Sequence, residues 1–349
     1  MNEKRLKEIL KAMQLQCRSD FVKGQFYDEK RLSAIQGLIE SSNHRNHYRL
    51  MFRGMSCRIY AKNGVVSDID KPIILISSHV DTVPTKLFAI EDEEQRLLKG
   101  TFDNTITNAA CVYAMTEMDL PDNVVFTFTA DEETGHCRGA KSTVDYLLRQ
   151  GIAKENIHAI SLDVTYEGYD NCAFTIENAK ATEDTAVFMD CINRLDKPYV
   201  YAKRYRDKAV DNAKHVSHKA SWFDEGAAYN TYIGVNGLSF CMPVAGDGGE
   251  NDMHSNNGVF AKTDAFVGYT QALCDTVKDY SLSCSLSVRL SRSGALQEHH
   301  IRGGTPCDVS HETPPEKEYR LRSEADGKQT LSQQHIYSAD KDLEEEREM

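Results

Sequence analysis

The sequence lacks the features that mark several classes of protein. Its ten cysteines include no CxxC pair, which argues against a zinc ribbon and a disulfide framework and favours reduced thiols in the cytoplasm. No apolar run approaches the ~20 residues that span a bilayer. Residues 1–17 are charged in their first turn and carry apolar residues at helical spacing, which indicates an amphipathic helix rather than a signal peptide. Secretion and membrane insertion are therefore not expected.

An excess of basic residues is also absent. The chain of 349 residues has 41 Lys and Arg against 53 Asp and Glu, which gives a formal net charge of −12. A broad basic surface for phosphate backbones is not expected from this balance, so nucleic acid is not expected as a partner. A solvated acidic surface accounts for most of the carboxylates, and some of them are candidates for metal ligands.

Short apolar runs rich in Ile, Val and Phe alternate with stretches of helical periodicity, which predicts an α/β protein with a largely parallel, buried sheet. The expected strands are residues 55–61, 73–78, 124–130, 157–163, 172–177, 199–204 and 238–242. The expected helices are residues 2–16, 29–41, 107–118, 139–150, 184–195, 223–233 and 262–280. We expect residues 1–283 to form a single three-layer α/β/α domain. Residues 284–349 lose apolar periodicity, so we expect them to form a disordered polar tail.

One expected strand leads directly into a histidine. The segment ILISSHVDTVP runs from buried aliphatics into His79, and Asp81 follows two residues later. Ligands bind beyond the carboxyl ends of the strands in parallel α/β sheets, so His79 is placed to meet one. Asp81 could accept a hydrogen bond from the far ring nitrogen of His79 and fix its tautomer for a metal ion. A purely structural His–Asp pair is the alternative for this motif taken alone.

Two other expected strands end in carboxylates. The segment VVFTFTADEETG ends in Asp131, Glu132 and Glu133, and IHAISLDV ends in Asp163. Adjacent glutamates at the exit of a buried strand are electrostatically costly unless a positive group lies beside them. A metal ion would supply that charge, with one glutamate as its ligand and the neighbouring glutamate left free as a base.

Two loops complete the set of candidate ligands. GTFDNTITNAA places Asp103 just ahead of an expected helix, where helix capping is the ordinary alternative role, and AGDGGENDMHSNNG delivers His254 from a glycine-rich loop. Together the strand ends and loops supply two histidines and at least three carboxylates, which are ligands of zinc, manganese or cobalt rather than of calcium. A bridging carboxylate can hold two ions ~3.5–4 Å apart, and five residues suffice for such a centre.

The segments HVDTVP, FDN, ADEETG, SLDV and MHS, in this order, resemble the co-catalytic metallopeptidase superfamily called peptidase clan MH. The clan includes aminopeptidases, dipeptidases, carboxypeptidases and N-acyl amino acid deacylases. The resemblance covers roughly residues 70–270 and implies a zinc-exopeptidase fold, which is phosphorylase/hydrolase-like, with two divalent ions.

The resemblance also implies a role for each candidate. His79 and Asp163 would bind one ion, and Glu133 and His254 would bind the other. Asp103 would bridge the two ions. Glu132 would be the general base and Asp81 would orient His79.

Some members of the clan insert a lid or dimerisation domain between the last Asp ligand and the final His. In this chain the interval from Asp163 to His254 already has to hold strands and helices, which leaves no room for a further domain of ~100 residues. The chain therefore resembles the compact aminopeptidase branch without a lid. Lidded members often use a histidine of the lid to steady the oxyanion, and His215, His218 and Tyr229 are candidates to replace it. Asp224 is expected to cap a helix, with contact to a substrate amine as the alternative.

These inferences predict a metal-dependent exopeptidase, with an aminopeptidase preferred, that uses water activated by two metal ions and Glu132 as general base. Zinc is the expected metal, and cobalt or manganese would accept the same ligands. An N-acyl amino acid deacylase or a dipeptidase would use the same site. An inactive metal-binding scaffold is an alternative of a different class, against which the presence of Glu132 argues. The expected partner is a peptide or acyl-amino-acid substrate, and a homo-oligomer is left open.

Overall fold

The computed structural model describes residues 1–301, apart from residues 15–19, 23–24, 28, 43–46, 67, 70, 85, 203–208, 210–211, 215 and 218–222. The chain divides into a unit of residues 1–299 and a second unit of residues 300–349. Nearly all of the second unit falls outside the described residues. The tail expected at residues 284–349 overlaps the last helix as far as Ile301 and otherwise lies outside the described residues, so the boundary at 284 stays a prediction.

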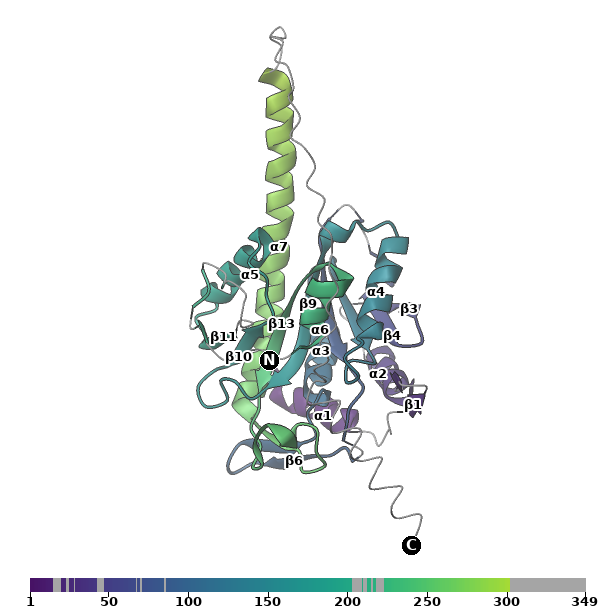
Figure 1. Cartoon of the computed structure of the whole chain (residues 1–349), viewed down its shortest axis with the longest axis vertical. Coiled ribbons are helices and arrows are strands. Elements are labelled where there is room, and N and C mark those ends of the chain that lie inside the picture. Colours follow the sequence, from purple (N-terminus) through teal and green to yellow (C-terminus); the bar gives the residue numbers. More distant parts are fainter. Residues whose placement is uncertain are drawn as a thin grey trace, which may run out of the picture. The chain divides into compact units, whose positions relative to one another are not determined.

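A central sheet organises the first unit (Figure 1). Among the described residues it has nine strands in the order β12-β11-β10-β13-β9-β5-β8-β4-β3. Their bounds are β3 Tyr48–Arg53, β4 Cys57–Lys62, β5 Ile73–His79, β8 Val124–Thr129, β9 Ile157–Thr165, β10 Phe174–Glu177, β11 Tyr199–Ala202, β12 Val216–Ser217 and β13 Asn236–Pro243. The strands are parallel from β13 to β8 and from β10 to β12, whereas the β10–β13, β8–β4 and β4–β3 pairs are antiparallel.

Helices cover both faces of this sheet, as Figure 1 shows. Their bounds are α1 Glu3–Met13, α2 Glu29–Ser41, α3 Thr105–Glu117, α4 Arg138–Arg149, α5 Glu183–Arg194, α6 Glu225–Ala228 and α7 Thr263–Ile301, with short turns η1 Lys154–Asn156, η2 Tyr229–Ile233 (π-helical) and η3 Gly249–Asp252. None of the described helices combines the length and apolar character that a bilayer span needs. The expected three-layer α/β/α fold with a mostly parallel sheet is confirmed.

Side-chain alternation along the strands separates two hydrophobic layers. On β5, Ile74 and Ile76 pack with residues of α1, α2, α3, α5 and α7, while Ile73 and Leu75 pack with α4, α6 and η2 on the opposite face. His79 continues the alternation of Ile73 and Leu75, so its side chain belongs to the face covered by α4 and α6. The candidate site therefore lies on that face, at the carboxyl ends of the central strands.

A smaller sheet brings two loops together. It is formed by β6 (Ala89–Asp92), β7 (Leu97–Gly100) and β14 (Val259–Lys262), and β7 pairs antiparallel with both of the others. Because β7 ends just before Asp103 and β14 begins just after the turn that carries His254, their pairing places these two distant segments side by side. A two-stranded hairpin of β1 (Asp20–Val22) and β2 (Gln25–Tyr27) lies near the N-terminus.

The expected helices agree with the observed ones, with two differences. The helix expected at residues 223–233 is a short α6 that continues as a π-helical turn, and the helix expected to end at residue 280 continues to Ile301. The sequence did not predict β1, β2, β3, β6, β7, β12 or β14, because these strands are short and most of them combine apolar residues with charged ones.

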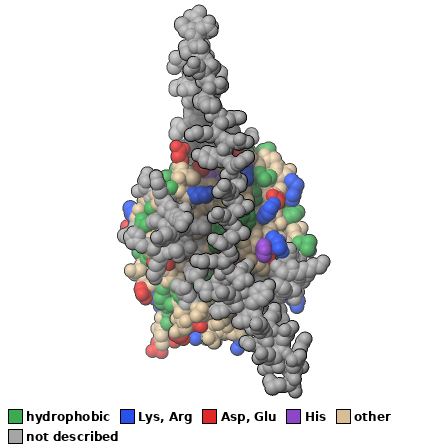
Figure 2. Space-filling view, viewed as in Figure 1, with side chains coloured by type: hydrophobic (Ala, Val, Ile, Leu, Met, Phe, Trp, Pro, Cys, Tyr) green, Lys and Arg blue, Asp and Glu red, His purple; other side chains and the backbone are tan. Residues whose placement is uncertain are grey.

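The surface shows mixed charge on the one face seen in Figure 2. Blue and red side chains are interspersed over the described part of that face, without a broad basic area there. This distribution fits the negative net charge of the chain.

Close packing of α6 against β13 depends on a glycine. A Cβ atom at Gly226 would lie 2.9 Å from the backbone nitrogen of Ser239 and closer still to its Oγ. Asp224 Oδ1 accepts a hydrogen bond of 2.9 Å from the N–H of Ala227 and so caps α6, which confirms the capping role expected for Asp224. The glycine and the cap together hold α6 over the polar end of the sheet.

Replacing Gly226 by Ala is expected to destabilise the fold by about 1–3 kcal/mol, because α6 must move away from β13. A Cβ atom at Gly268, in the second turn of α7, would have no atom within 4 Å, so Gly268→Ala should instead stabilise the helix by about 0.5–1 kcal/mol. Thermal unfolding midpoints of the two variants should therefore shift in opposite directions from the wild type. A Gly226→Ala midpoint equal to that of the wild type would refute the close packing.

Candidate metal centre

Three neighbouring strands carry the first group of site residues. His79 is the last residue of β5, Asp163 lies near the end of β9, and the turn after β8 carries Glu132 and Glu133. The strands β9, β5 and β8 are adjacent and parallel, so their carboxyl ends meet at one edge of the sheet. Residues that are distant in sequence are therefore brought within contact distance.

Asp103 lies at the middle of the cluster. Its Oδ1 is 3.2 Å from His79 Nε2, and its Oδ2 is 3.2 Å from His254 Nε2. Each carboxylate oxygen thus faces a different histidine, which is the arrangement of a bridging carboxylate. The cap role that was the alternative for this segment is not observed, because the residue at the start of α3 makes no side-chain cap hydrogen bond.

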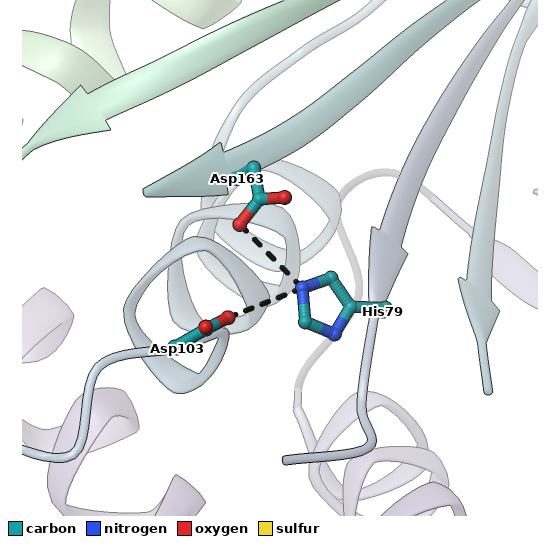
Figure 3. A group of neighbouring side chains, drawn as sticks. All are labelled: His79, Asp103 and Asp163. Atoms are coloured by element: carbon teal, nitrogen blue, oxygen red, sulfur yellow. Dashed lines mark ion pairs between the residues drawn. The ribbon is translucent and has the colours of Figure 1, made fainter. Parts of the chain in front are cut away.

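The remaining candidates divide between the two histidines. Asp163 Oδ1 lies 3.5 Å from His79 Nε2, as Figure 3 shows, and Glu133 Oε2 lies 3.7 Å from His254 Nε2. His79, Asp103 and Asp163 form one group whose ligand atoms could hold an ion, and Asp103, Glu133 and His254 form another. All five predicted ligands are therefore brought together, and Asp103 is shared by both groups.

Glu132 lies against the same cluster. Its Oε2 is 4.0 Å from His79 Nε2, and its side chain is 13% exposed. A third group of possible ligand atoms contains Glu132 with His79 and Glu133. Glu132 is therefore close enough to act on whatever the two main groups hold, while its side chain remains accessible from solvent.

Buried polar atoms in the cluster fit bound cations. His79 Nε2, Asp103 Oδ1 and Glu133 Oε1 are buried and make no hydrogen bond within the described residues. Leaving buried polar atoms without a hydrogen bond is costly. Imidazole nitrogen and carboxylate oxygen are the donors that zinc, manganese and cobalt accept, so the residues present fit divalent metal ions.

The pKa shifts of the carboxylates in the cluster also fit bound cations. Burial raises the pKa of Glu132 and of Glu133 well above the usual range, and neighbouring carboxylate charges add to each shift. Burial also raises the pKa of Asp163. Each shift is the cost of placing a carboxylate charge among others away from water. A cation between these groups would remove that cost.

The histidines respond to the same carboxylates. The hydrogen bond to Asp103 raises the pKa of His254. Burial opposes protonation of His79, but the charges of Glu132 and Asp163 outweigh it and raise the His79 pKa. Burial would raise the pKa of Asp103, and the two histidines lower it instead. Protonated imidazoles thus provide positive charge that metal ions would otherwise supply.

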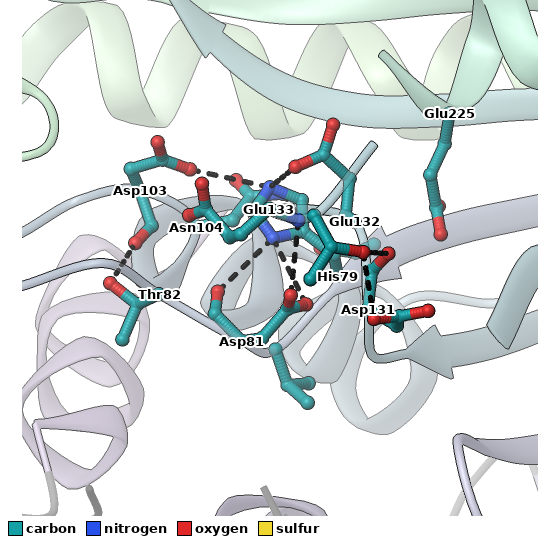
Figure 4. A network of polar contacts seen from close by, with 12 residues as sticks. His79, Asp81, Thr82, Asp103, Asn104, Asp131, Glu132, Glu133 and Glu225 are labelled. Atoms are coloured by element: carbon teal, nitrogen blue, oxygen red, sulfur yellow. Dashed lines mark hydrogen bonds and ion pairs between the residues drawn. The ribbon is translucent and has the colours of Figure 1, made fainter. Parts of the chain in front are cut away.

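Asp81 supports the centre through its backbone and its side chain. His79 Nδ1 lies 3.1 Å from the Asp81 carbonyl oxygen and 3.6 Å from Asp81 Oδ1. Asp81 Oδ2 accepts a hydrogen bond of 3.1 Å from the N–H of Glu133. Figure 4 shows these contacts. The carbonyl, which the sequence pattern did not single out, is thus the closer partner of the His79 ring.

The turn after β8 carries both glutamates of the cluster. Asp131 adopts a left-handed conformation with φ of 75°, which aspartate tolerates better than most residues. Thr134 Oγ1 donates a hydrogen bond of 2.8 Å to Asp131 Oδ1. This turn directs Glu132 and Glu133 into the cluster from one short segment.

One side of the cluster is closed and the other is open. On the closed side, His79 and Asp103 are buried. On the open side, the side chain of His254 is 55% exposed and that of Asp163 is 14% exposed. A substrate would therefore approach from the side of Glu132, Asp163 and His254.

Of the three candidates for an oxyanion contact, the one that the structure describes, Tyr229, does not reach this open side. Tyr229 is fully buried in the layer beneath α6, and His215 and His218 lie outside the described residues.

The structure also contains a buried Glu225 that the sequence pattern did not reveal. Ser77 Oγ donates a hydrogen bond of 2.7 Å to Glu225 Oε2, and burial raises the pKa of Glu225 to about 7. Its signal in the sequence was limited to a charged residue next to the helix cap at Asp224.

Comparison with known proteins agrees with this geometry. The sequence model of peptidase family M20/M25/M40 matches residues 75–321. No curated protein matches the chain. The chain is similar in structure to the aminopeptidase LapA of Legionella pneumophila, with a TM-score of 0.52 and 12% identity over 80% of this chain and 71% of that one.

Two further solved structures are similar. One is a tripeptidase of Staphylococcus aureus, with a TM-score of 0.52 and 11% identity over 80% of this chain and 99% of that one. The other is the aminopeptidase PepT of Bacillus cereus, with a TM-score of 0.51 and 9% identity over 80% of this chain and 99% of that one. At such identities these likenesses establish the fold.

The stability of the metal-free chain is expected to fall as pH rises. Groups whose pKa is raised by folding stabilise the folded state fully below their unfolded pKa, and that stability is lost as pH rises through the folded pKa. His79, His254, Glu132, Glu133 and Asp163 all have raised pKa values, and within this cluster Asp103 alone has a lowered one. The decline should begin near pH 3.8, the ordinary pKa of aspartate, and steepen above pH 4.5, the ordinary pKa of glutamate.

Zinc should reverse this trend, because its ligands must be deprotonated. The gain in unfolding midpoint on adding zinc to chelator-treated protein should grow between about pH 5 and 8, and zinc at 100 times its Kd would contribute about 2.7 kcal/mol. Scanning fluorimetry with and without zinc measures this gain. A gain that is independent of pH, or one that survives in Asp163→Asn and His254→Ala together, would contradict the assigned ligands.

Proposed function

The chain belongs to peptidase family M20/M25/M40, and on this premise we propose that it is an aminopeptidase that removes the N-terminal residue of peptides. The observation that carries the proposal is the shared Asp103, whose two oxygens each lie 3.2 Å from a different histidine. Such sharing favours two metal ions, and the neighbouring Glu132 supplies a group suited to acid–base chemistry.

The proposed ligands of one ion are His79 and Asp163, those of the other are Glu133 and His254, and Asp103 would contribute to both. Zinc is the metal we propose. When bound, two such ions would lower the pKa of the attacking water and would stabilise the negative charge that develops on the oxygen of the scissile carbonyl.

Glu132 is proposed as the general base. Its carboxylate accepts a proton from the attacking water and then delivers that proton to the departing amine. Two features support this role. The side chain lies 4.0 Å from His79 Nε2 and retains exposure to solvent, and its raised pKa brings it closer to the range in which a carboxyl can both accept and donate.

Asp81 is proposed to act through His79. The contact between the Asp81 carbonyl and His79 Nδ1 holds the ring with Nε2 towards Asp103 and Asp163. The Asp81 carboxylate also fixes the backbone of Glu133. Asp81 would therefore position one ligand of each ion without touching the substrate.

The described residues between Asp163 and His254 form strands and helices of the central layers, without an inserted lid among them. We also infer a reducing compartment such as the cytoplasm, because the cysteines of the described residues are free thiols, and most of them are buried.

Replacing Glu132 by Gln should lower kcat by at least about 10²–10⁴-fold, because the proton acceptor is lost while the shape of the side chain is kept. The metal content of the variant should stay equal to that of the wild type, since none of the five proposed ligands changes. Steady-state kinetics and metal analysis of the same preparations check both expectations. Turnover that survives in Glu132→Gln would refute the mechanism, and an equally inactive wild type that binds metal would favour an inactive scaffold.

A substrate panel separates the aminopeptidase from its alternatives. Aminoacyl anilides and tripeptides should be cleaved by the zinc-loaded enzyme, and N-terminal acetylation of the same tripeptides should abolish cleavage. Activity only on N-acyl amino acids would instead indicate a deacylase, and activity only on dipeptides would indicate a dipeptidase. Glu132→Gln assayed beside the wild type controls for contaminating peptidases.

A further inference from the structure

The ladder that pairs strands β5 and β9 ends at the candidate metal centre. The last residue pair in their parallel ladder is Ser78 with Leu162, and His79 and Asp163 follow immediately. Beyond this pair the two strands carry facing ligands, with Asp163 Oδ1 3.5 Å from His79 Nε2. The distance between the two strand ends is therefore no longer set by strand-to-strand hydrogen bonds of this ladder, and another interaction has to set it.

Asn104 links the bridging residue to β9. Its Nδ2 donates a hydrogen bond of 2.7 Å to the carbonyl oxygen of Leu162, the residue before Asp163. Asn104 directly follows Asp103 in the chain, as Figure 4 shows. One side-chain amide thus fixes the backbone of Asp103 against the backbone of Asp163.

Asn108, one turn further along α3, makes the corresponding link to β5. Its Nδ2 donates a hydrogen bond of 2.9 Å to the carbonyl oxygen of His79, and its Oδ1 accepts one of 3.0 Å from Ser78 Oγ. The start of α3 is therefore connected to both strand ends.

Hydroxyl groups fix the orientation of these two amides. Thr107 Oγ1 donates to Asn104 Oδ1 and lies 2.9 Å from Ser78 Oγ. Asn104, Thr107, Asn108 and Ser78 are all fully buried. With both amide oxygens accepting from hydroxyl donors, the two NH₂ groups face the backbone carbonyls, and Asn104 Nδ2 also lies 3.5 Å from Ser78 Oγ.

We propose that Asn104 and Asn108 are positioning residues that set the separation of His79, Asp103 and Asp163 and thereby the affinity for the ion those three residues would hold. The proposal rests on the metal centre described under the proposed function. It assigns a role in metal binding to two uncharged residues that touch neither the ion nor the substrate.

Substitution by leucine, which has nearly the shape of asparagine, removes the amide without leaving a cavity. Zinc affinity is measured in a His254→Ala background, so that only the site of His79, Asp103 and Asp163 contributes, with free zinc set by a chelator buffer. Asn104→Leu and Asn108→Leu should each weaken zinc binding by about 10–100-fold, the usual effect of losing a group that orients a ligand.

Asn230 provides a matched control. It is also buried, and its Nδ2 donates to the carbonyls of Asn178 and Gly237 at 2.7 Å and 2.5 Å, but none of its partners is adjacent to a proposed ligand. Asn230→Leu should lower the unfolding midpoint of the metal-free chain by an amount similar to the other two variants and leave zinc affinity unchanged. An equal loss of zinc affinity in Asn230→Leu would overturn the proposal, because a general loss of stability would then explain all three.

Thr107→Val keeps the measurement decisive if the leucine variants fail to fold. It conserves size and removes only the hydroxyl that orients Asn104, so zinc affinity should fall in the same direction by a smaller factor. Wild-type affinity in Thr107→Val, or in folded Asn108→Leu, would refute the positioning role while leaving the metal centre intact. A parent chain that binds no zinc would refute the metal centre and this proposal together.

Discussion

Carboxylate crowding at the carboxyl ends of β9, β5 and β8 is the constraint on which the rest of the site depends. Five acidic side chains, Asp81, Asp103, Glu132, Glu133 and Asp163, lie around one buried histidine and one exposed histidine. Charges of one sign at such distances and in such burial raise the free energy of the folded chain unless cations are present. Such a cluster destabilises the folded state of a protein without bound metal, whereas bound metal ions offset its electrostatic cost.

The fold determines where each residue of this cluster lies. Parallel strands bring His79 and Asp163 to one edge, and the turn after β8 adds two adjacent glutamates. The pairing of β7 with β14 brings the loop of Asp103 beside the turn of His254. Asp103 consequently stands between the two histidines and offers one oxygen to each. The small sheet of β6, β7 and β14 thus positions two of the proposed ligands, as the central strands position the others.

Much of this arrangement was predictable from the sequence, and the reasons are local. His79, Glu133 and Asp163 each end or follow an apolar strand, so the rule for parallel sheets placed them together. Asp103 and His254 come from loops, and only the likeness of their motifs to a peptidase clan suggested their place. The pairing of β7 with β14 that positions them involves short strands with charged residues, which carry no distinctive pattern. The amides of Asn104 and Asn108 were equally unpredictable, because their partners are backbone carbonyls.

The most direct test of the central claim is X-ray diffraction from zinc-soaked crystals, recorded on both sides of the zinc absorption edge. We predict two anomalous peaks separated by about 3.5–4 Å, one among His79, Asp103 and Asp163 and the other among Asp103, Glu133 and His254. A single peak away from Asp103, or zinc only at surface histidines, would contradict the account.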